Sequence, residues 1–279
     1  MFLHQLRNEL WKLFGKKRTY IGFGMLLLAQ NTFNVIFRFT NAFRFYERTL
    51  EGNGYAAQQF LSALSICSIM LIPLAGLLMP LYVALVGGDL VAKEAEDGTL
   101  RMILSRPVSR VRLLVVKWLA GFIFTVGLVL VLSVLGLLSA RLFFPWGGLF
   151  FWNPEFGIFG VFDADAGLKR YVAASIFLVS HAFSIMGLAS MFSCFNIKPA
   201  AATILALSFL FVDLILQSMP YFREYHNFFI TYHLQTWHYL FAQPIPWWRV
   251  AQSLSVLAGA NVTFLVVGVV AFHARDIKS

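Results

Sequence analysis

Three histidines and two aspartates are the residues whose types could hold a metal ion. His226 and His233 lie seven residues apart and could share one helical face, whereas His238 would need a break in the helix to join them. Asp163 and Asp165 could add carboxylate ligands, although nothing in their spacing demands it. Imidazoles with ordinary hydrogen bonds in an aromatic-rich interface explain the same histidines, so we assign no metal to this chain.

One carboxylate, Asp213, lies among apolar side chains in the run LSFLFVDLILQ. Placing such a group in a bilayer costs about 3 kcal/mol, so it normally faces a protein interior, a partner or water. Fourteen helical residues counted from Pro199 rise about 21 Å, which places Asp213 toward the far end of that helix. It could line a translocation path, hold a proton, pair with His181 or form a structural polar contact, and the sequence leaves these alternatives open.

Nucleotide chemistry has no recognisable site in the sequence. The phosphate-binding pattern G-x-x-x-x-G-K-[ST] is absent, and the nearest stretch, residues 15–17, lacks the first glycine and the hydroxyl. Cys67 and Cys194 lie inside apolar runs, as small core residues do. An intramembrane enzyme would need clustered reactive groups, which Asp213 and His181 alone do not supply. We therefore expect no catalytic residue.

The composition is that of a membrane protein. The 279 residues are 59% hydrophobic and only 13% charged, with a mean hydropathy of +0.74. Soluble domains are nearer half apolar and a quarter charged, so this chain would expose too much apolar surface in water. The net charge of +9 is then a signal of membrane orientation rather than of nucleic-acid binding, because no soluble segment carries a basic stripe.

Six apolar stretches are long enough to cross a bilayer, whose core of about 30 Å needs roughly 20 helical residues. The predicted spans are residues 20–37, 61–87, 113–140, 171–194, 199–218 and 249–272. Pro73 and Pro80 should kink or break the second span. The predicted fold class is an all-α membrane protein, with residues 1–279 forming a single transmembrane domain.

The basic residues predict the orientation of the chain. Segments 1–19, 88–117, 195–198 and 273–279 hold fourteen of the 22 lysines and arginines, and the opposite segments hold eight. Because loops on the cytoplasmic side carry the excess of basic residues, we expect both termini in the cytoplasm of a bacterial-type plasma (inner) membrane.

Three further segments have a distinct character. Residues 1–18 begin with an amphipathic pattern and predict a helix that lies on the inner membrane surface. Residues 141–170 and 219–248 are dense in aromatic side chains, which belong at a membrane interface, and they fall on the outer side.

The charged residues gather between spans two and three, where residues 93–117 read KEAEDGTLRMILSRPVSRVRLLVVK. Gly98 offers a left-handed stop to one helix, and Thr99 can cap a second, short one. Pro107 should end that short helix, and Ser109 can cap span three. Residues 88–110 are therefore predicted to form a helix–turn–helix elbow beneath the membrane.

This stretch resembles the signature E-x-x-x-G-T-L…L-S-x-P-[VI]-S-R…K of ABC-2 type transporter permeases, and Lys117 matches its last residue. The end of the chain, with Arg275 and Asp276, and the amphipathic first helix also resemble that family. In the family the elbow is a coupling helix that docks on an ATP-hydrolysing subunit. The matching positions are Glu94, Gly98, Thr99, Leu100, Ser105, Pro107, Ser109 and Arg110.

The resemblance implies partners and a function. It implies two permease chains, with a homodimer as the simplest case, and two separate ABC ATPase subunits that bind the ATP and Mg²⁺. It also implies transport, with export as the default direction, and a re-entrant helix pair between the last two spans. The substrate is not readable from the sequence.

Two other functions remain open. The chain could be a mechanotransmitter that uses ATPase coupling to drive a partner on the outer side without transport. It could also be a proton-coupled carrier that uses Asp213, in which case its activity would not depend on ATP.

Overall fold

The computed structural model describes residues 2–105 and 109–275. Within these residues, six spans are long and apolar enough to cross a membrane, which confirms a predominantly α-helical, multi-pass membrane protein; a short β-hairpin is the departure from an all-α fold. The spans are α2 (Lys17–Phe39), the α5–η1–α6 unit (Ala63–Pro73, Leu74–Leu78 and Met79–Glu96), α8 (Arg110–Phe143), α9 (Ala164–Ser193), α10 (Pro199–Ser218) and α12 (Trp247–Ala274). Most spans are longer than predicted. The 34 residues of α8 rise about 51 Å, so this helix projects beyond a hydrocarbon core.

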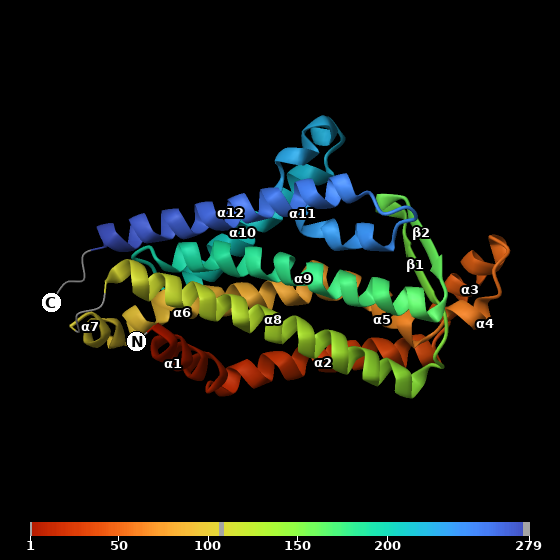
Figure 1. The fold of residues 1–279 in the computed structure, drawn as a ribbon, viewed down its shortest axis with the longest axis horizontal. Helices are drawn as coiled ribbons and strands as arrows, with labels where there is room; N and C mark the ends of the chain where they lie inside the picture. Colours follow the sequence, from red (N-terminus) through yellow and green to blue (C-terminus); the bar gives the residue numbers. More distant parts are fainter. Residues whose placement is uncertain (1, 106–108, 276–279) are drawn as a thin grey trace.

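Helix α9 lies at the centre of the bundle and packs against α6, α8, α10 and α12. The first helix, α1 (Phe2–Phe14), packs against α8 at one end of the bundle. Both termini and the short helix α7 (Thr99–Leu104) lie at that end, which we call the elbow end (Figure 1). The strands β1 (Leu149–Asn153) and β2 (Ile158–Phe162) cover the opposite end, which we call the hairpin end (Figure 1).

The hairpin is a feature that the sequence reading missed. β1 and β2 pair in antiparallel register from Leu149–Phe162 to Asn153–Ile158. The short turn η2 (Pro154–Phe156) connects them, and Gly157 adopts the positive φ of 63° that closes it. Two helices, α3 (Ala42–Gly52) and α4 (Ala57–Phe60), lie beside it and share a small core. The aromatic residues of this end therefore pack against one another to form a folded cap.

Residues 219–248 form short helical turns where two re-entrant helices were expected. They are η3 (Pro220–Phe228), α11 (Ile230–Leu234) and η4 (Gln235–Phe241). Arg170 of α9 donates to the carbonyl oxygens of Leu240 and Ala242 at 2.8 and 3.3 Å, which holds the end of η4 on the bundle. Its guanidinium also lies 4.9 Å from the centre of the Phe162 ring, which joins η4 to the hairpin.

The second span bulges after Pro73 and does not break. Leu74–Leu78 form a single π-helical stretch between two α-helical parts, because a proline cannot donate the hydrogen bond that a regular turn requires. Pro80 lies at the start of α6, where its missing N–H is tolerated.

Close packing between α6 and α9 depends on Gly87. A Cβ atom at this position would lie 2.8 Å from the Met186 carbonyl oxygen and 2.9 Å from the Ala189 Cβ. Neither group can move away easily, because one is backbone and the other is a methyl carried directly on a helix. Small residues allow membrane helices to approach in this way.

We expect Gly87→Ala to lower the free energy of unfolding by about 1–3 kcal/mol, since the added methyl forces α6 and α9 apart. The measurement is unfolding in a denaturing detergent. Gly24→Ala is the matched control, because nothing lies within 4 Å of a Cβ at that position. Equal stability of the two variants would contradict this account of the helix contact.

Candidate functional site

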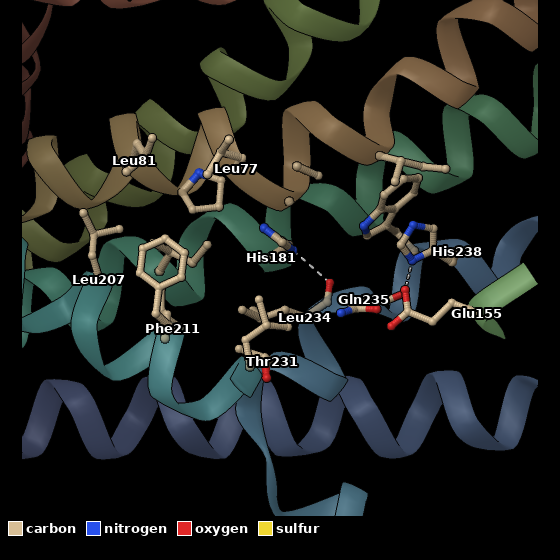
Figure 2. A pocket seen from close by; sticks show the side chains of 18 of the residues that line it. Leu77, Leu81, Glu155, His181, Leu207, Phe211, Thr231, Leu234, Gln235 and His238 are labelled. Carbon is tan, nitrogen blue, oxygen red and sulfur yellow. Dashed lines mark hydrogen bonds between the residues drawn. The ribbon is translucent and has the colours of Figure 1, made fainter. Parts of the chain in front are cut away.

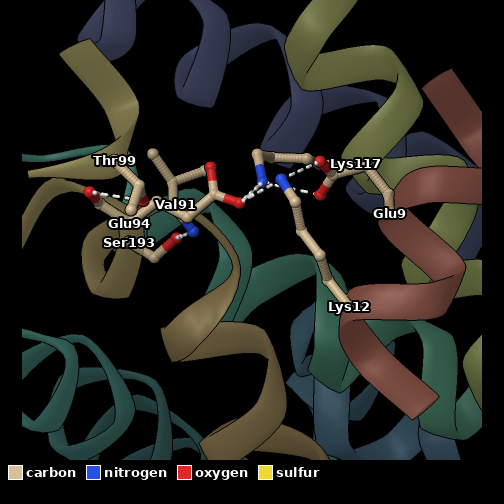
Figure 3. A network of polar contacts seen from close by, with 7 residues as sticks. All are labelled: Glu9, Lys12, Val91, Glu94, Thr99, Lys117 and Ser193. Atoms are coloured by element: carbon tan, nitrogen blue, oxygen red, sulfur yellow. Dashed lines mark hydrogen bonds and ion pairs between the residues drawn. The ribbon is translucent and has the colours of Figure 1, made fainter. Parts of the chain in front are cut away.

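A buried lysine organises the elbow end. Lys117, in the second turn of α8, is only 2% exposed. Its ammonium group lies 2.7 Å from Glu9 Oε2 and 2.8 Å from Glu94 Oε1. Lys12 lies 2.7 Å from Glu9 Oε1 and 2.9 Å from Glu94 Oε1, so two cations and two anions alternate in a closed network (Figure 3). We call Glu9, Lys12, Glu94 and Lys117 the charge clamp.

The clamp joins three segments that are far apart in the sequence. Glu9 and Lys12 belong to α1, Glu94 to the last turn of α6, and Lys117 to α8. Burial alone would raise the pKa of the Glu9 carboxyl, but Lys117 and then Lys12 outweigh it, and the pKa lies below its ordinary value of 4.5. Burial likewise opposes the charge of Lys12, yet Glu9 and Glu94 raise its pKa above the ordinary 10.5. The charged forms are therefore the stable ones.

The elbow has the predicted turn. α6 ends at Glu96, and Gly98 adopts a φ of +73°, a conformation that glycine reaches without strain. The prediction that Thr99 caps the next helix was wrong, because Gly98 takes the N-cap position. The Thr99 hydroxyl donates instead to the Glu94 carbonyl oxygen at 3.2 Å, which ties the new helix back to the old one. Leu100 is buried in the core and anchors α7.

The remaining residues of the motif form hydrogen bonds at the ends of helices. Ser105 donates to the Met102 carbonyl oxygen at 2.9 Å, and Ser109 caps α8 by accepting from Arg112 N at 3.3 Å, as predicted. Arg110 Nη1 donates to three carbonyl oxygens at the end of α12, the nearest being that of His273 at 3.0 Å. Pro107 lies outside the described residues.

A hollow of about 540 Å³ lies between α1, the end of α6 and α7. Its lining combines the clamp residues Glu9, Lys12 and Glu94 with Thr99 and Met102 of the elbow. On α7, Met102 is 66% exposed, and Arg101 is also exposed. The elbow therefore presents an uncovered face beside the clamp.

A second cavity, of about 210 Å³, lies toward the hairpin end between α6, α9, α10 and η4. Its walls are mostly apolar and include Leu77 of the π-helical stretch and Phe211 of α10 (Figure 2). His181 of α9 lines this cavity, and its Nδ1 lies 2.9 Å from the Leu234 carbonyl oxygen. His181 thus lies at a cavity wall, and its place on a translocation path stays a prediction.

Asp213 has a structural partner. Its Oδ2 accepts from Thr231 N and Thr231 Oγ1, both at 2.7 Å. Thr231 Oγ1 also lies 2.7 Å from Gln217 Oε1. Asp213 therefore attaches α10 to α11, and among the described residues it makes no ion pair with His181 and does not line the cavity. Of the alternatives, the structural contact fits best.

The three histidines of the metal hypothesis are not brought together. His233 uses both ring nitrogens, with Nε2 2.9 Å from the Asn227 carbonyl oxygen and Nδ1 2.9 Å from Ser253 Oγ. His238 lies beside the cavity, and His226 packs against Tyr232. Within residues 2–105 and 109–275, no three metal-ligating side chains form a group.

Sequence reasoning assigned no role to Glu9, Lys12 or Lys117. A signal was present, because a lysine inside the apolar start of a span requires a carboxylate nearby. The sequence did not indicate which of several acidic residues supplies it, since Glu9 precedes Lys117 by 108 positions.

We expect Lys117→Ala to lower the free energy of unfolding by about 3–5 kcal/mol, because the buried Glu9 carboxylate and the half-buried Glu94 carboxylate would lose their shared cation. Detergent-induced unfolding measures the change. Lys93→Ala is the control, since Lys93 forms ion pairs with Glu96 and Asp97 at the exposed surface and should change stability little. Adding Glu9→Gln to the Lys117 variant should recover part of the loss, and no recovery would contradict a direct ionic coupling.

The charge clamp also predicts that the stability of the protein depends on pH in the acidic range. The pKa of Glu9 is lower in the folded protein than its ordinary value of 4.5. Its contribution to the free energy of unfolding is therefore complete at pH values above 4.5. That contribution is lost as the pH falls below 4.5 and through the folded pKa. We expect the wild-type protein to lose more stability in this window than Glu9→Gln does. Unfolding curves at a series of pH values test this, and parallel losses in the two proteins would contradict it.

Comparison with known proteins gives a family without an assigned activity. A search of curated proteins finds no match to the chain. Residues 21–278 match the sequence model of one family, a match that includes the elbow, α8 and the cavity and omits α1. The chain belongs to the family described as "Protein of unknown function (DUF2705)".

Proposed function

We propose that the chain is the permease subunit of an ATP-driven ABC-2 type transporter, coupled through residues 88–110 to a separate ATPase subunit. The observation that carries the proposal is a short helix, α7, that is fixed to the bundle and leaves one face uncovered. Leu100 and the charge clamp fix it, and Arg101 and Met102 are exposed. A rigid element with an open face is what transmitting movement between subunits requires.

The second span connects this helix to the cavity. α6 begins beside the π-helical stretch that lines the cavity and continues to Glu94 in the clamp. A displacement of α7 would therefore act along a continuous helix on the cavity wall. In this proposal, closure of the ATPase pair moves the elbow, and the bundles of two permease chains open a path between them.

We propose that the elbow end faces the cytoplasm of a bacterial-type inner membrane. The excess of basic residues in the segments at this end supports the orientation. ATP and Mg²⁺ bind to the ATPase subunits, of which two are expected for two permease chains. Export is the proposed direction of transport.

The contacts change the roles proposed for two motif residues. Glu94 is paired with Lys12 and Lys117, and Arg110 is bonded to the end of α12, so both act within the chain. Contact with the ATPase is assigned to the exposed residues Arg101 and Met102.

We expect the chain, purified in a mild detergent from its native membrane, to co-elute with a P-loop ATPase at near equal stoichiometry. Met102→Glu and Arg101→Glu should reduce the co-eluting ATPase by roughly tenfold, the usual loss at a central interface residue. Quantitative mass spectrometry of the eluted complex measures it. Asn196→Glu, which adds a charge to an exposed loop at the elbow end, is the control.

Two results would contradict the proposal. The wild-type chain could elute without an ATPase at every salt concentration, or the two α7 variants could retain it fully.

The mechanotransmitter remains the second candidate, and the folded cap at the hairpin end favours it. The cap has its own core of Leu50, Ala57, Leu61 and Phe150 and could present a surface to an outer partner. ATP-dependent movement of a substrate across sealed vesicles distinguishes the two functions, since only a transporter requires it.

A further inference from the structure

The cavity beside the second span opens between two helices whose neighbouring side chains are uncovered. Leu77 and Leu81, at its α6 wall, are 50% and 38% exposed, and Phe211 of α10 is 44% exposed. These residues lie on helices that are long and apolar enough to span a membrane, where exposed apolar side chains meet hydrocarbon. The apolar wall is therefore accessible from the lipid, and a hydrocarbon chain matches its chemistry.

His238, one of several buried polar residues that line the cavity, lies at the end nearest the hairpin (Figure 2). It is 5% exposed, and its ring stacks on Phe156 with centroids 5.0 Å apart and an interplanar angle of 22°. Its Nδ1 lies 3.0 Å from the Gln235 carbonyl oxygen. Stacking and hydrogen bonding together fix the orientation of the imidazole.

The same hydrogen bond fixes the tautomer. A carbonyl oxygen only accepts, so the proton of the neutral ring lies on Nδ1 and Nε2 carries a lone pair. The ring is neutral at physiological pH, because burial lowers the pKa of His238 to about 3 against the opposing effect of the Gln235 hydrogen bond. His238 Nε2 is thus an acceptor, and it finds no donor among the described residues.

The surroundings of His238 restrict what can supply that donor. Glu155, on the turn of the hairpin, lines the same end of the cavity and is exposed there. No lysine or arginine is found among the described lining residues. An anionic head group would meet a carboxylate and a lone pair without a compensating cation. A hydroxyl can instead donate its one proton to His238 Nε2, and an ammonium can donate to both groups.

His181 contributes to the wall only. Its Nε2 also has no hydrogen-bond partner among the described residues, but the Ala75 carbonyl lies near this ring. We therefore place the polar end of the ligand at His238.

We propose that this cavity binds an amphiphile with a hydrocarbon chain along α6 and α10 and a head group that donates a hydrogen bond to His238 Nε2. The head is a hydroxyl or an ammonium, and Glu155, at the same end of the cavity as His238, selects against anions. The inference rests on the proposed function, because it names the class of molecule that the transporter would carry. Its test measures ligand binding to this chain alone, without an ATPase.

The test compares three probes of equal chain length: tritiated 1-dodecanol, dodecylammonium and laurate. Binding to the wild-type chain is measured in phosphatidylcholine nanodiscs. We expect saturable binding of dodecanol and dodecylammonium, and at least tenfold weaker binding of laurate. His238→Phe keeps an aromatic ring and removes the acceptor, so it should weaken dodecanol binding roughly two- to tenfold. His226→Phe, which changes a histidine outside the cavity, is the matched control.

If the His238 variant does not fold, Glu155→Gln keeps the test decisive. Glu155 is exposed, so its substitution should leave the fold intact. It should weaken dodecylammonium binding and leave dodecanol binding unchanged. Three outcomes would overturn the proposal. The first is no saturable binding of any probe, which would mean that the cavity holds only water or bulk lipid. The others are binding of laurate as tight as that of dodecanol, and unchanged binding in both variants. None of these would alter the co-elution result for the ATPase, so the two failures are distinguishable.

Discussion

A lysine buried at the edge of the bilayer needs carboxylates within reach, and Lys117 obtains them from two separate segments. Glu9 comes from the amphipathic first helix and Glu94 from the end of the second span. Because removing either carboxylate would leave Lys12 and Lys117 to share the other one, with an excess positive charge in a medium of low polarity, the network favours one relative position of the three helices. The elbow, its turn at Gly98 and the exposed face of α7 all depend on that position.

The second span joins the two ends of the molecule. Pro73 prevents a regular helix, and the resulting π-helical stretch forms part of the cavity wall. Beyond it, α6 continues without interruption to the clamp. A ligand that changes the cavity and a partner that moves the elbow would therefore act on one helix, which is the physical basis for coupling them. The close approach of α6 to α9 at Gly87 keeps this helix against the centre of the bundle.

Features set by local sequence were predictable, and those set by tertiary contacts were not. Six spans follow from long apolar runs, and the Gly98 turn and Ser109 cap follow from local backbone chemistry. The hairpin was missed because an aromatic segment gives the same signal at an interface and in a strand. The partners of Lys117 and Asp213 were missed because they come from irregular or remote segments, whose positions depend on how the bundle packs.

The interaction on which the elbow depends is the charge clamp, which should hold α7 at a fixed position relative to α1. Spin labels at Leu3 and Met102, two exposed residues, would report the distance between these helices in nanodiscs. Both native cysteines are buried, so labelling is selective for the introduced positions. We expect one narrow distance distribution in the otherwise wild-type chain and a broad one after Lys117→Ala. A broad distribution in both, or a narrow one that Lys117→Ala leaves unchanged, would contradict it.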